Sequence, residues 1–445
     1  MMAFMRLKQL HPGHVLFILL LSSAAVYPEA LEQALDDVTH WFATHFGWFV
    51  MLSCSFFVGF AFYLAFSRFG HLKLGDPDEV PQFSTLSWVA MLFAAGMGSG
   101  LIFYGAAEPL LHFQHPPPSA SIITEQAEIA RRSMAITFFH WGIHAWVIYA
   151  IAALSIAYFT FHTHMPMLPS TPLVYFMPRG SRKALRRVID TMAVLGVVFG
   201  MVASISTALL QLSKGVSSEL SVSMSPVTLQ FLILAVMFVC YSLSASTGIG
   251  KGIKILSDIN MSIAVLVMVF IIIVGPTLVV FDSFVTAIGD YLDQFVSLSF
   301  NLRPFSDNTG WTGSWSITYF LWWISWGPFV GVFIARISRG RTIRQFLLGV
   351  ILVPTVFSAL WFAALGGSAL NLELFAAPGF ADGAQPSEVI FRMIKYFPLD
   401  TILGLILLLL LFVFLITSAD SGSYVLAMFT REGELSPPVW ERLFG

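Results

Sequence analysis

The feature that most constrains this 445-residue chain is a series of long apolar runs, each about long enough to cross a lipid bilayer as a helix. A spanning helix needs about 20 apolar residues, whereas barrel strands are shorter and alternate in polarity. With only 11% charged residues, the chain is not designed to face water on all sides. We therefore predict an all-α membrane protein. The ten predicted spans lie near residues 12–30, 46–67, 86–111, 131–160, 186–212, 225–246, 256–281, 314–337, 343–370 and 400–427.

Basic residues orient these spans, because Lys and Arg gather in cytoplasmic loops. With the N-terminus in the cytoplasm, 17 of the 23 Lys and Arg residues fall in segments on the inner side. We thus predict a multi-pass protein of the cell inner (plasma) membrane with a cytoplasmic N-terminus. The net charge of −2 offers no basic field for nucleic acid. Cys54 and Cys240 lie inside apolar runs and indicate neither a disulfide framework nor a metal cluster.

One segment, residues 283–299, differs from the spans because Asp290 and Asp293 stand among regularly spaced apolar residues. This pattern is typical of an amphipathic helix at the outer membrane surface. An ordinary surface helix packed on the bundle explains it equally well.

Two predicted spans contain helix-breaking residues near their middle. The third has the glycine-rich stretch 96–100, and the eighth has Ser-Trp-Gly-Pro-Phe at 325–329. Such residues weaken a helix, and the freed backbone groups must line a cavity or be covered by protein. Small residues also let helices pack closely, but interruptions at matching places in two halves indicate a transporter binding site.

Aromatic residues stand at midplane, although membrane tryptophans usually sit at the interfaces. On the fourth span Trp141, Trp146 and Tyr149 share one side, and Trp322, Trp323 and Trp326 lie in the middle of the eighth. A quaternary ammonium group has no hydrogen-bond donor, so ring faces are its natural ligands. The combined set predicts a box for such a cation.

Other polar residues in the apolar runs have competing interpretations. His140 and His144 have the spacing of a metal pair but lack the zincin glutamate, so packed, hydrogen-bonded histidines are the default. Thr417 and Ser418 could offer hydroxyls to Na⁺ together with backbone carbonyls from an unwound helix, or could bond the carbonyl one turn back. Asp420 is an intramembrane acid, and such acids are commonly functional.

Five blocks of sequence resemble the betaine/choline/carnitine transporter family, from about residue 40 to the end. The blocks are AAGMGSGLIFYGAAEPL (94–110), FFHWGIHAWVIYA (138–150), GIGKGIKILSDIN (248–260), WWISWGPFVGVFIARISRGRTIRQF (322–346) and ITSADSG (416–422). The resemblance implies a leucine-transporter-like inverted repeat of five plus five helices preceded by two helices, often in a homotrimer. Two more spans would be expected after residue 430, so the last two helices are apparently missing.

On this pattern the chain divides into four parts. Residues 1–85 hold the N-terminal segment and the two leading helices, and 86–282 form the first five-helix repeat. Residues 283–310 contain the outer-surface helix and a linker, and 314–445 form an incomplete second repeat.

The resemblance also implies roles for particular residues. Trp141, Trp146, Tyr149 and Trp323 would form the trimethylammonium box, with Trp322 and Trp326 close by on the permeation path. The broken third span would contribute Met97, Gly98 and Gly100. One Na⁺ site would use Ala94, Met97, Phe414, Thr417 and Ser418. A second Na⁺ site would use Phe329 with hydroxyls of the fifth span, where this chain has Met201 and Ser204 in place of the expected threonines.

Position 100 bears on the solute, because choline carriers of the family tend to have an acid there and this chain has Gly100. Choline is a bare cation, whereas betaine brings its own carboxylate, which can face N–H groups of the broken helix. We predict a secondary transporter that imports glycine betaine or a related compatible solute by Na⁺ symport, with no cofactor besides Na⁺ as coupling ion. The alternatives are proton-driven choline uptake and a membrane-embedded enzyme that uses His140, His144 or Asp420.

Overall fold

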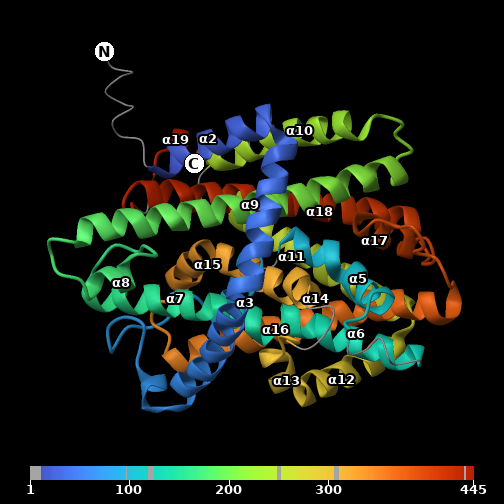
Figure 1. Ribbon diagram of the computed structural model, residues 1–445, viewed down its shortest axis with the longest axis horizontal. Helices are drawn as coiled ribbons and strands as arrows, with labels where there is room; N and C mark the ends of the chain where they lie inside the picture. The colour runs from blue at the N-terminus through green and yellow to red at the C-terminus, as the bar shows by residue number, and fades with distance from the viewer. Residues whose placement is uncertain are drawn as a thin grey trace.

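The computed structural model describes residues 12–96, 98–118, 125–247, 252–304, 310–434 and 437–444, which are almost wholly helical (Figure 1). Within these ranges there is no β-strand, only a bridge between Lys73 and Thr342. The predicted all-α class is therefore confirmed. The α-helices are α2 (Pro12–Val26), α3 (Pro28–Phe66), α4 (Thr85–Gly96), α5 (Ser99–Gln114), α6 (Gln126–Trp141), α7 (Ile143–Thr163), α8 (Thr171–Tyr175), α9 (Arg182–Glu219), α10 (Pro226–Thr247), α11 (Gly252–Val274), α12 (Thr277–Asp293), α13 (Phe295–Phe300), α14 (Gly310–Thr312), α15 (Thr318–Ile337), α16 (Ile343–Asn371), α17 (Pro386–Ile394), α18 (Asp400–Thr430) and α19 (Val439–Phe444). Shorter turns are the 3-10 helix η1 (Arg68–His71) and the π-helices η2 (Gly313–Ile317) and η3 (Leu372–Ala376).

Seven helical stretches in the described part of the chain are long and apolar enough to cross a membrane. They correspond to α3, α6 with α7, α9, α10, α14 to α15, α16 with η3, and α18. The ten predicted spans also included α2, which has only 15 residues, and α4 with α5, which are separate helices. The remaining one, α11, forms a bent pair with α12. The five-plus-five repeat and the four-part division stay predictions.

The first two predicted spans have different boundaries in the structure. Instead of ending near residue 30, α2 ends at Val26, and Pro28 starts α3 at once. Proline suits this first helical position because its missing N–H needs no partner there. The expected connection between residues 30 and 46 is therefore part of one 39-residue helix.

The amphipathic segment begins earlier than predicted. α12 starts at Thr277 and makes an angle of 111° with α11, after Gly275 and Pro276. This pair weakens the helix, because glycine gains conformational freedom outside it and proline donates no hydrogen bond to the preceding turn. α12 packs on α6 and α16, and Asp290 pairs with Arg131 of α6 at 2.9 Å. It is therefore a helix packed on the bundle.

Two breaks in the described helices lie beside the centre of the bundle, and the sequence indicated only one of them. The glycine-rich stretch separates α4 from α5 as expected. The expected break at 325–329 is wrong: α15 continues through Pro328, whose fixed φ fits a helix. An unpredicted break lies at Gly142, between α6 and α7.

Gly142 is needed at this break because of what lies against it. A Cβ here would stand 2.4 Å from the Phe138 carbonyl oxygen and 3.1 Å from the Tyr291 hydroxyl. That hydroxyl, from α12, accepts a hydrogen bond from the Ile143 N–H at 3.2 Å. The first free donor of α7 is thus satisfied by a side chain from another helix.

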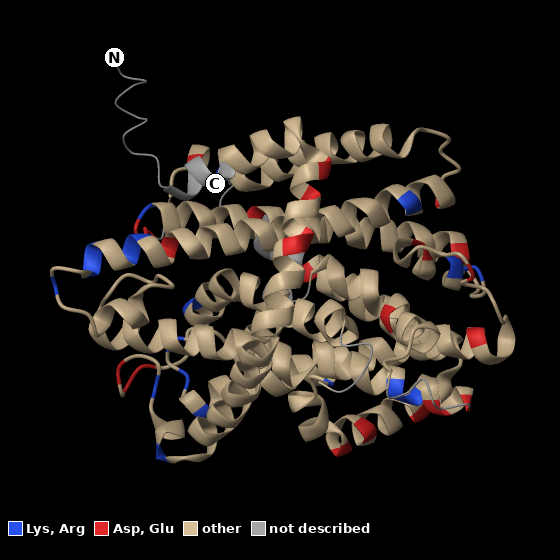
Figure 2. Ribbon diagram, viewed as in Figure 1, with Lys and Arg blue, Asp and Glu red and all other residues tan. Residues whose placement is uncertain are grey.

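Three helix pairs form the centre of the bundle: α15 against α7, α9 against α18, and α5 against α16 (Figure 1). Charged residues gather mainly toward the ends of the long helices and in the connections, apart from the acidic first half of α3 (Figure 2). The apolar middle of the bundle surrounds the cavity described next.

Candidate functional site

A cavity lies at the centre of the bundle, where α5, α6, α7, α9, α15 and α18 meet. It contains about 570 Å³ of empty space, counting its open mouth. One wall is aromatic, one is glycine backbone, and one carries hydroxyls. The lining residues are Gly98, Ser99, Gly100, Leu101, Trp141, Tyr149, Ser204, Trp322, Trp323, Trp326, Phe329, Val330, Thr417, Ser418 and Ser421.

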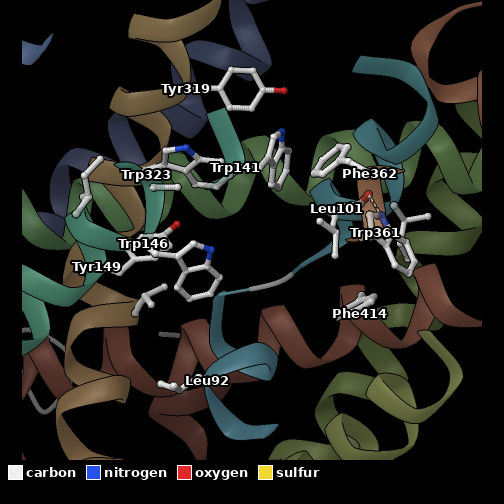
Figure 3. Packing of buried hydrophobic residues seen from close by; sticks show 14 of the residues in the cluster. Leu92, Leu101, Trp141, Trp146, Tyr149, Tyr319, Trp323, Trp361, Phe362 and Phe414 are labelled. Atoms are coloured by element: carbon white, nitrogen blue, oxygen red, sulfur yellow. Dashed lines mark hydrogen bonds between the residues drawn. The ribbon is translucent and has the colours of Figure 1, made fainter. Parts of the chain in front are cut away.

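The aromatic wall is built by α6, α7 and α15, whose rings lie close together and point inward (Figure 3). Trp141 and Trp323 meet edge to face, with ring centroids 5.0 Å apart and planes at 70°. Tyr149 meets Trp323 in the same way at 6.2 Å. Since Trp141, Tyr149 and Trp323 are each at most 6% exposed, these rings face protein and not lipid.

The other predicted aromatic residues are placed differently. Trp146 is buried but does not line the cavity, and it packs edge to face on Tyr149 at 5.7 Å (Figure 3). Trp322 stacks on Trp323 at 4.9 Å with planes only 12° apart. Trp326 lines the cavity one turn further along α15 and packs on Phe329 at 5.2 Å. Of the four residues predicted to form the box, Trp141, Tyr149 and Trp323 line the cavity, and Trp146 packs behind Tyr149.

Two of these indoles are fixed by hydrogen bonds on the side away from the cavity. Trp323 donates from Nε1 to the backbone carbonyl of His140 at 3.0 Å. Trp141 donates from Nε1 to Oε2 of Glu108 at 2.6 Å. Because each ring is held at its N–H, its position beside the cavity is fixed by a bond that a ligand in the cavity does not need.

Glu108 of α5 has no exposed surface and accepts hydrogen bonds at both carboxylate oxygens. Oε2 accepts from the Trp141 indole and from the Tyr319 hydroxyl, each at 2.6 Å. Oε1 lies 2.8 Å from Nδ1 of His140 and 3.3 Å from Nε2 of His112. A buried carboxylate needs such compensation, and here all its partners are side chains from α5, α6 and α15.

Sequence reasoning missed the role of Glu108, although it noted the AAGMGSGLIFYGAAEPL block that contains it. An acid inside an apolar run was the available signal. Its partners were not visible, because His140 and Tyr319 are 32 and 211 residues away along the chain.

The glycine wall is the start of α5, at the break after α4. Gly98 is the residue before the helix, and Ser99 and Gly100 begin it. The first N–H groups of a helix have no partner within it and carry the positive end of its dipole. This wall can therefore receive a carboxylate.

Gly100 lets the aromatic and glycine walls come together. A Cβ at this position would stand 3.0 Å from the Trp322 ring and 3.3 Å from the Trp141 ring. Both distances are tighter than ordinary contact, so a larger side chain would push the rings aside. At Gly98 a Cβ would find only the Ser418 hydroxyl, at 3.8 Å.

The hydroxyl wall is formed by α9 and α18, near the residues predicted to bind Na⁺. Thr417 donates to the carbonyls of Val413 and Phe414 at 3.0 and 3.1 Å, so α18 is not unwound here. Thr417 and Ser418 both line the cavity, and a hydroxyl that donates its hydrogen keeps lone pairs that can accept a ligand. Ser99 donates to the Ser204 carbonyl at 3.3 Å, across from α18.

The remaining predicted ion ligands are only partly placed. Met97 lies outside the described residues, and the side chain of Ala94 does too. Phe414 is buried without lining the cavity, while Phe329 lines it.

The polar residues with competing interpretations have side-chain partners. His140 bonds Glu108 and, through Nε2, Ser316 at 2.9 Å, while His144 reaches Ser299 at 3.0 Å. The two histidines therefore do not converge on one point. Asp420 is buried and accepts a hydrogen bond from Ser244 of α10 at 2.6 Å.

Comparison with known proteins places the chain. Residues 11–445 match the profile of BCCT, the betaine/carnitine/choline family transporters. The chain belongs to this transporter family. The expected family is thereby confirmed, and with it a transport function in place of an enzyme activity.

Individual BCCT relatives agree with this placement. The glycine betaine transporter OpuD of Bacillus subtilis is 42% identical over 96% of this chain and 84% of its own length. The ectoine/hydroxyectoine transporter of Virgibacillus pantothenticus is 38% identical over 95% of this chain and 84% of its own. The glycine betaine transporter of Acinetobacter baylyi is 36% identical over 97% of this chain, which spans 65% of that relative's length. The apolar helices and these relatives together make this BCCT chain a multi-pass membrane protein.

Proposed function

We propose that this protein imports glycine betaine, or a closely related quaternary-ammonium zwitterion, by symport with Na⁺. The observation that carries the proposal is the cavity, where buried rings face the start of a helix. Ring faces attract the methylated cation, and the free N–H groups of α5 attract the carboxylate. Two of the BCCT relatives described above carry glycine betaine in their names.

The rings must part to admit the solute. Trp141 and Trp323 are in direct edge-to-face contact, which leaves no room for a trimethylammonium group between them. The onium group can lie against the ring faces only after a small separation of α15 from α6 and α7. Such an adjustment fits a carrier that changes shape during each cycle.

Na⁺ coupling is supported by the hydroxyl wall. Thr417 and Ser418 offer neutral oxygen ligands beside the glycine wall, and Ser204 adds a third hydroxyl to the lining. Hard oxygen donors suit a hard cation such as Na⁺. Because the ion and the solute would share one cavity, binding of one would favour binding of the other.

Transport measurements on the full chain in proteoliposomes test the proposal. Uptake of labelled glycine betaine should depend on Na⁺ and should fall to background when K⁺ replaces Na⁺ at fixed pH. Unlabelled betaine should compete better than choline. Proton-driven choline uptake would instead be shown by three results: uptake is independent of Na⁺, choline competes better than betaine, and a proton uncoupler abolishes uptake.

A further inference from the structure

We propose that Glu108 is a positioning residue for solute binding, and that it sets the cation affinity of the box through Trp141. This inference rests on the proposed function, because it concerns how the same cavity recognises an onium group. Glu108 does not line the cavity. It touches the ligand-facing ring from behind.

The first step is that Glu108 fixes where Trp141 lies. The indole N–H can only donate, so Oε2 must accept from it, at 2.6 Å. The same oxygen accepts from Tyr319, which brings α15 to the same point. Trp141 is the last residue of α6, directly before the break at Gly142, so the helix alone does not hold its ring.

The second step concerns charge. Each of the four partners of Glu108 has an N–H or O–H to give, and an ionised carboxylate has lone pairs for all of them. A hydrogen bond to an anion pushes electron density into the indole. The face of the Trp141 ring that meets the bound cation therefore becomes more negative, which strengthens the cation–π attraction.

The third step is that a purely structural hydrogen bond to the Trp141 indole would not require a carboxylate. A structural bond needs only an acceptor, which a main-chain carbonyl provides for Trp323 through His140. Trp141 instead donates to a carboxylate with no exposed surface, and keeping that group buried and ionised takes four hydrogen-bond donors. The difference between the two indoles indicates that the charge itself is used.

The experiment compares two ligands that differ in one atom. Glycine betaine has a quaternary nitrogen, and 3,3-dimethylbutyrate has a carbon in its place with the same shape and carboxylate. In Glu108→Gln the amide oxygen can still accept from Trp141, while the charge is gone. Dissociation constants are measured by calorimetry on the purified full chain in nanodiscs.

We expect Glu108→Gln to weaken betaine binding about tenfold, which is less than the roughly thirtyfold that a whole desolvated cation–π contact contributes. Binding of 3,3-dimethylbutyrate should change less than about threefold, since its carbon centre has no charge to attract. In a Trp141→Phe background the same substitution should leave the ratio of the two constants almost unchanged. Equal weakening of both ligands, or the same change of ratio with and without the indole, would overturn the proposal.

The matched control is Asp190→Asn, at another buried carboxylate. Asp190 is 3% exposed and bonds Ser170 at 3.0 and 3.2 Å, away from the cavity lining. This variant should keep the wild-type ratio. A ratio that falls in it as much as in Glu108→Gln would assign the effect to general loss of a buried charge and would contradict our inference.

A second measurement needs no ligand and separates this inference from the proposed function. In protein labelled with ¹⁵N-tryptophan, the indole resonance missing in Trp141→Phe belongs to Trp141. Glu108→Gln should move that resonance upfield and leave the Trp323 resonance in place. If the wild type binds no onium solute, the proposed function fails, yet this shift still decides whether Glu108 polarises the indole. An unmoved Trp141 resonance would sink the inference by itself.

Discussion

The aromatic wall and the hydroxyl wall of the cavity differ in how hydrogen bonds hold their side chains. In the aromatic wall, Trp141 and Trp323 have their N–H groups bonded behind the cavity and present ring faces to it. In the hydroxyl wall, Thr417 bonds its own helix and presents lone pairs. The two indoles depend on partners from other helices, while Thr417 depends on the geometry of its own helix. Substitutions should therefore affect the two walls differently.

The largest effect is expected where a lining ring is removed. Trp323→Leu loses a ring face worth about 2 kcal/mol to a desolvated cation, so the Kd for betaine should rise about thirtyfold. Calorimetry on the reconstituted protein measures it. Leu keeps the site apolar, and an unchanged elution volume and melting temperature would show that the fold is intact. Undiminished affinity in a folded variant would rule out the aromatic wall as the onium site.

A smaller effect is expected at the junction of the aromatic and glycine walls. Gly100→Ala places a methyl group about where Trp322 and Trp141 approach to 3.0 and 3.3 Å. Displacing packed rings costs about 1–3 kcal/mol, so betaine affinity should fall roughly tenfold. Gly98→Ala is the matched control, because its methyl group meets only the Ser418 hydroxyl at ordinary distance. Equal losses in the two variants would mean that ring placement is not the cause.

A change confined to the hydroxyl wall should alter ion dependence before solute affinity. Thr417→Val keeps the shape and removes the oxygen, and a lost oxygen ligand of about 1 kcal/mol raises the half-saturating Na⁺ concentration about fivefold. Uptake at saturating betaine over a range of Na⁺ concentrations measures this. Thr417→Ser should stay close to wild type because it retains the hydroxyl. Should Val leave the Na⁺ curve where it was, Thr417 is not an ion ligand.

The smallest effect is expected at Trp146, which sharpens the comparison within the aromatic wall. Trp146 packs behind Tyr149 and does not line the cavity. Trp146→Phe keeps an aromatic contact there, so the Kd for betaine should change less than about threefold. A loss as large as that of Trp323→Leu would show that Trp146 enters the site during transport.

Much of the molecule follows from patterns along the chain, because apolar length fixes membrane helices and ring-bearing residues at midplane stand out. The helical class, the break at Gly98 and the gathering of Trp141, Tyr149 and Trp323 on one cavity were all visible in this way. The role of Glu108 was not, since it depends on three helices meeting.

The two misjudged breaks have different physical reasons. Pro328 predicted an interruption, but its fixed φ fits a helix and α15 continues through it. No break was predicted at Gly142. The Tyr291 hydroxyl from α12 occupies the space beside this residue and accepts a hydrogen bond from the next N–H, that of Ile143. At Gly142 a group from a neighbouring helix decides the backbone, and local sequence does not contain it.

The unbroken course of α15 has a mechanical consequence. Trp323 and Phe329 stand on the same rigid rod, and at 1.5 Å of rise per residue they are separated by about 9 Å along its axis. A tilt that opens the rings for the solute must also displace the phenyl group beside the hydroxyls. Under the proposed Na⁺ symport, thermodynamic reciprocity requires that any binding free energy that Na⁺ gains from that tilt also appears as tighter binding of the solute. One continuous helix, α15, would thus be enough to couple the binding of the ion to the binding of the solute.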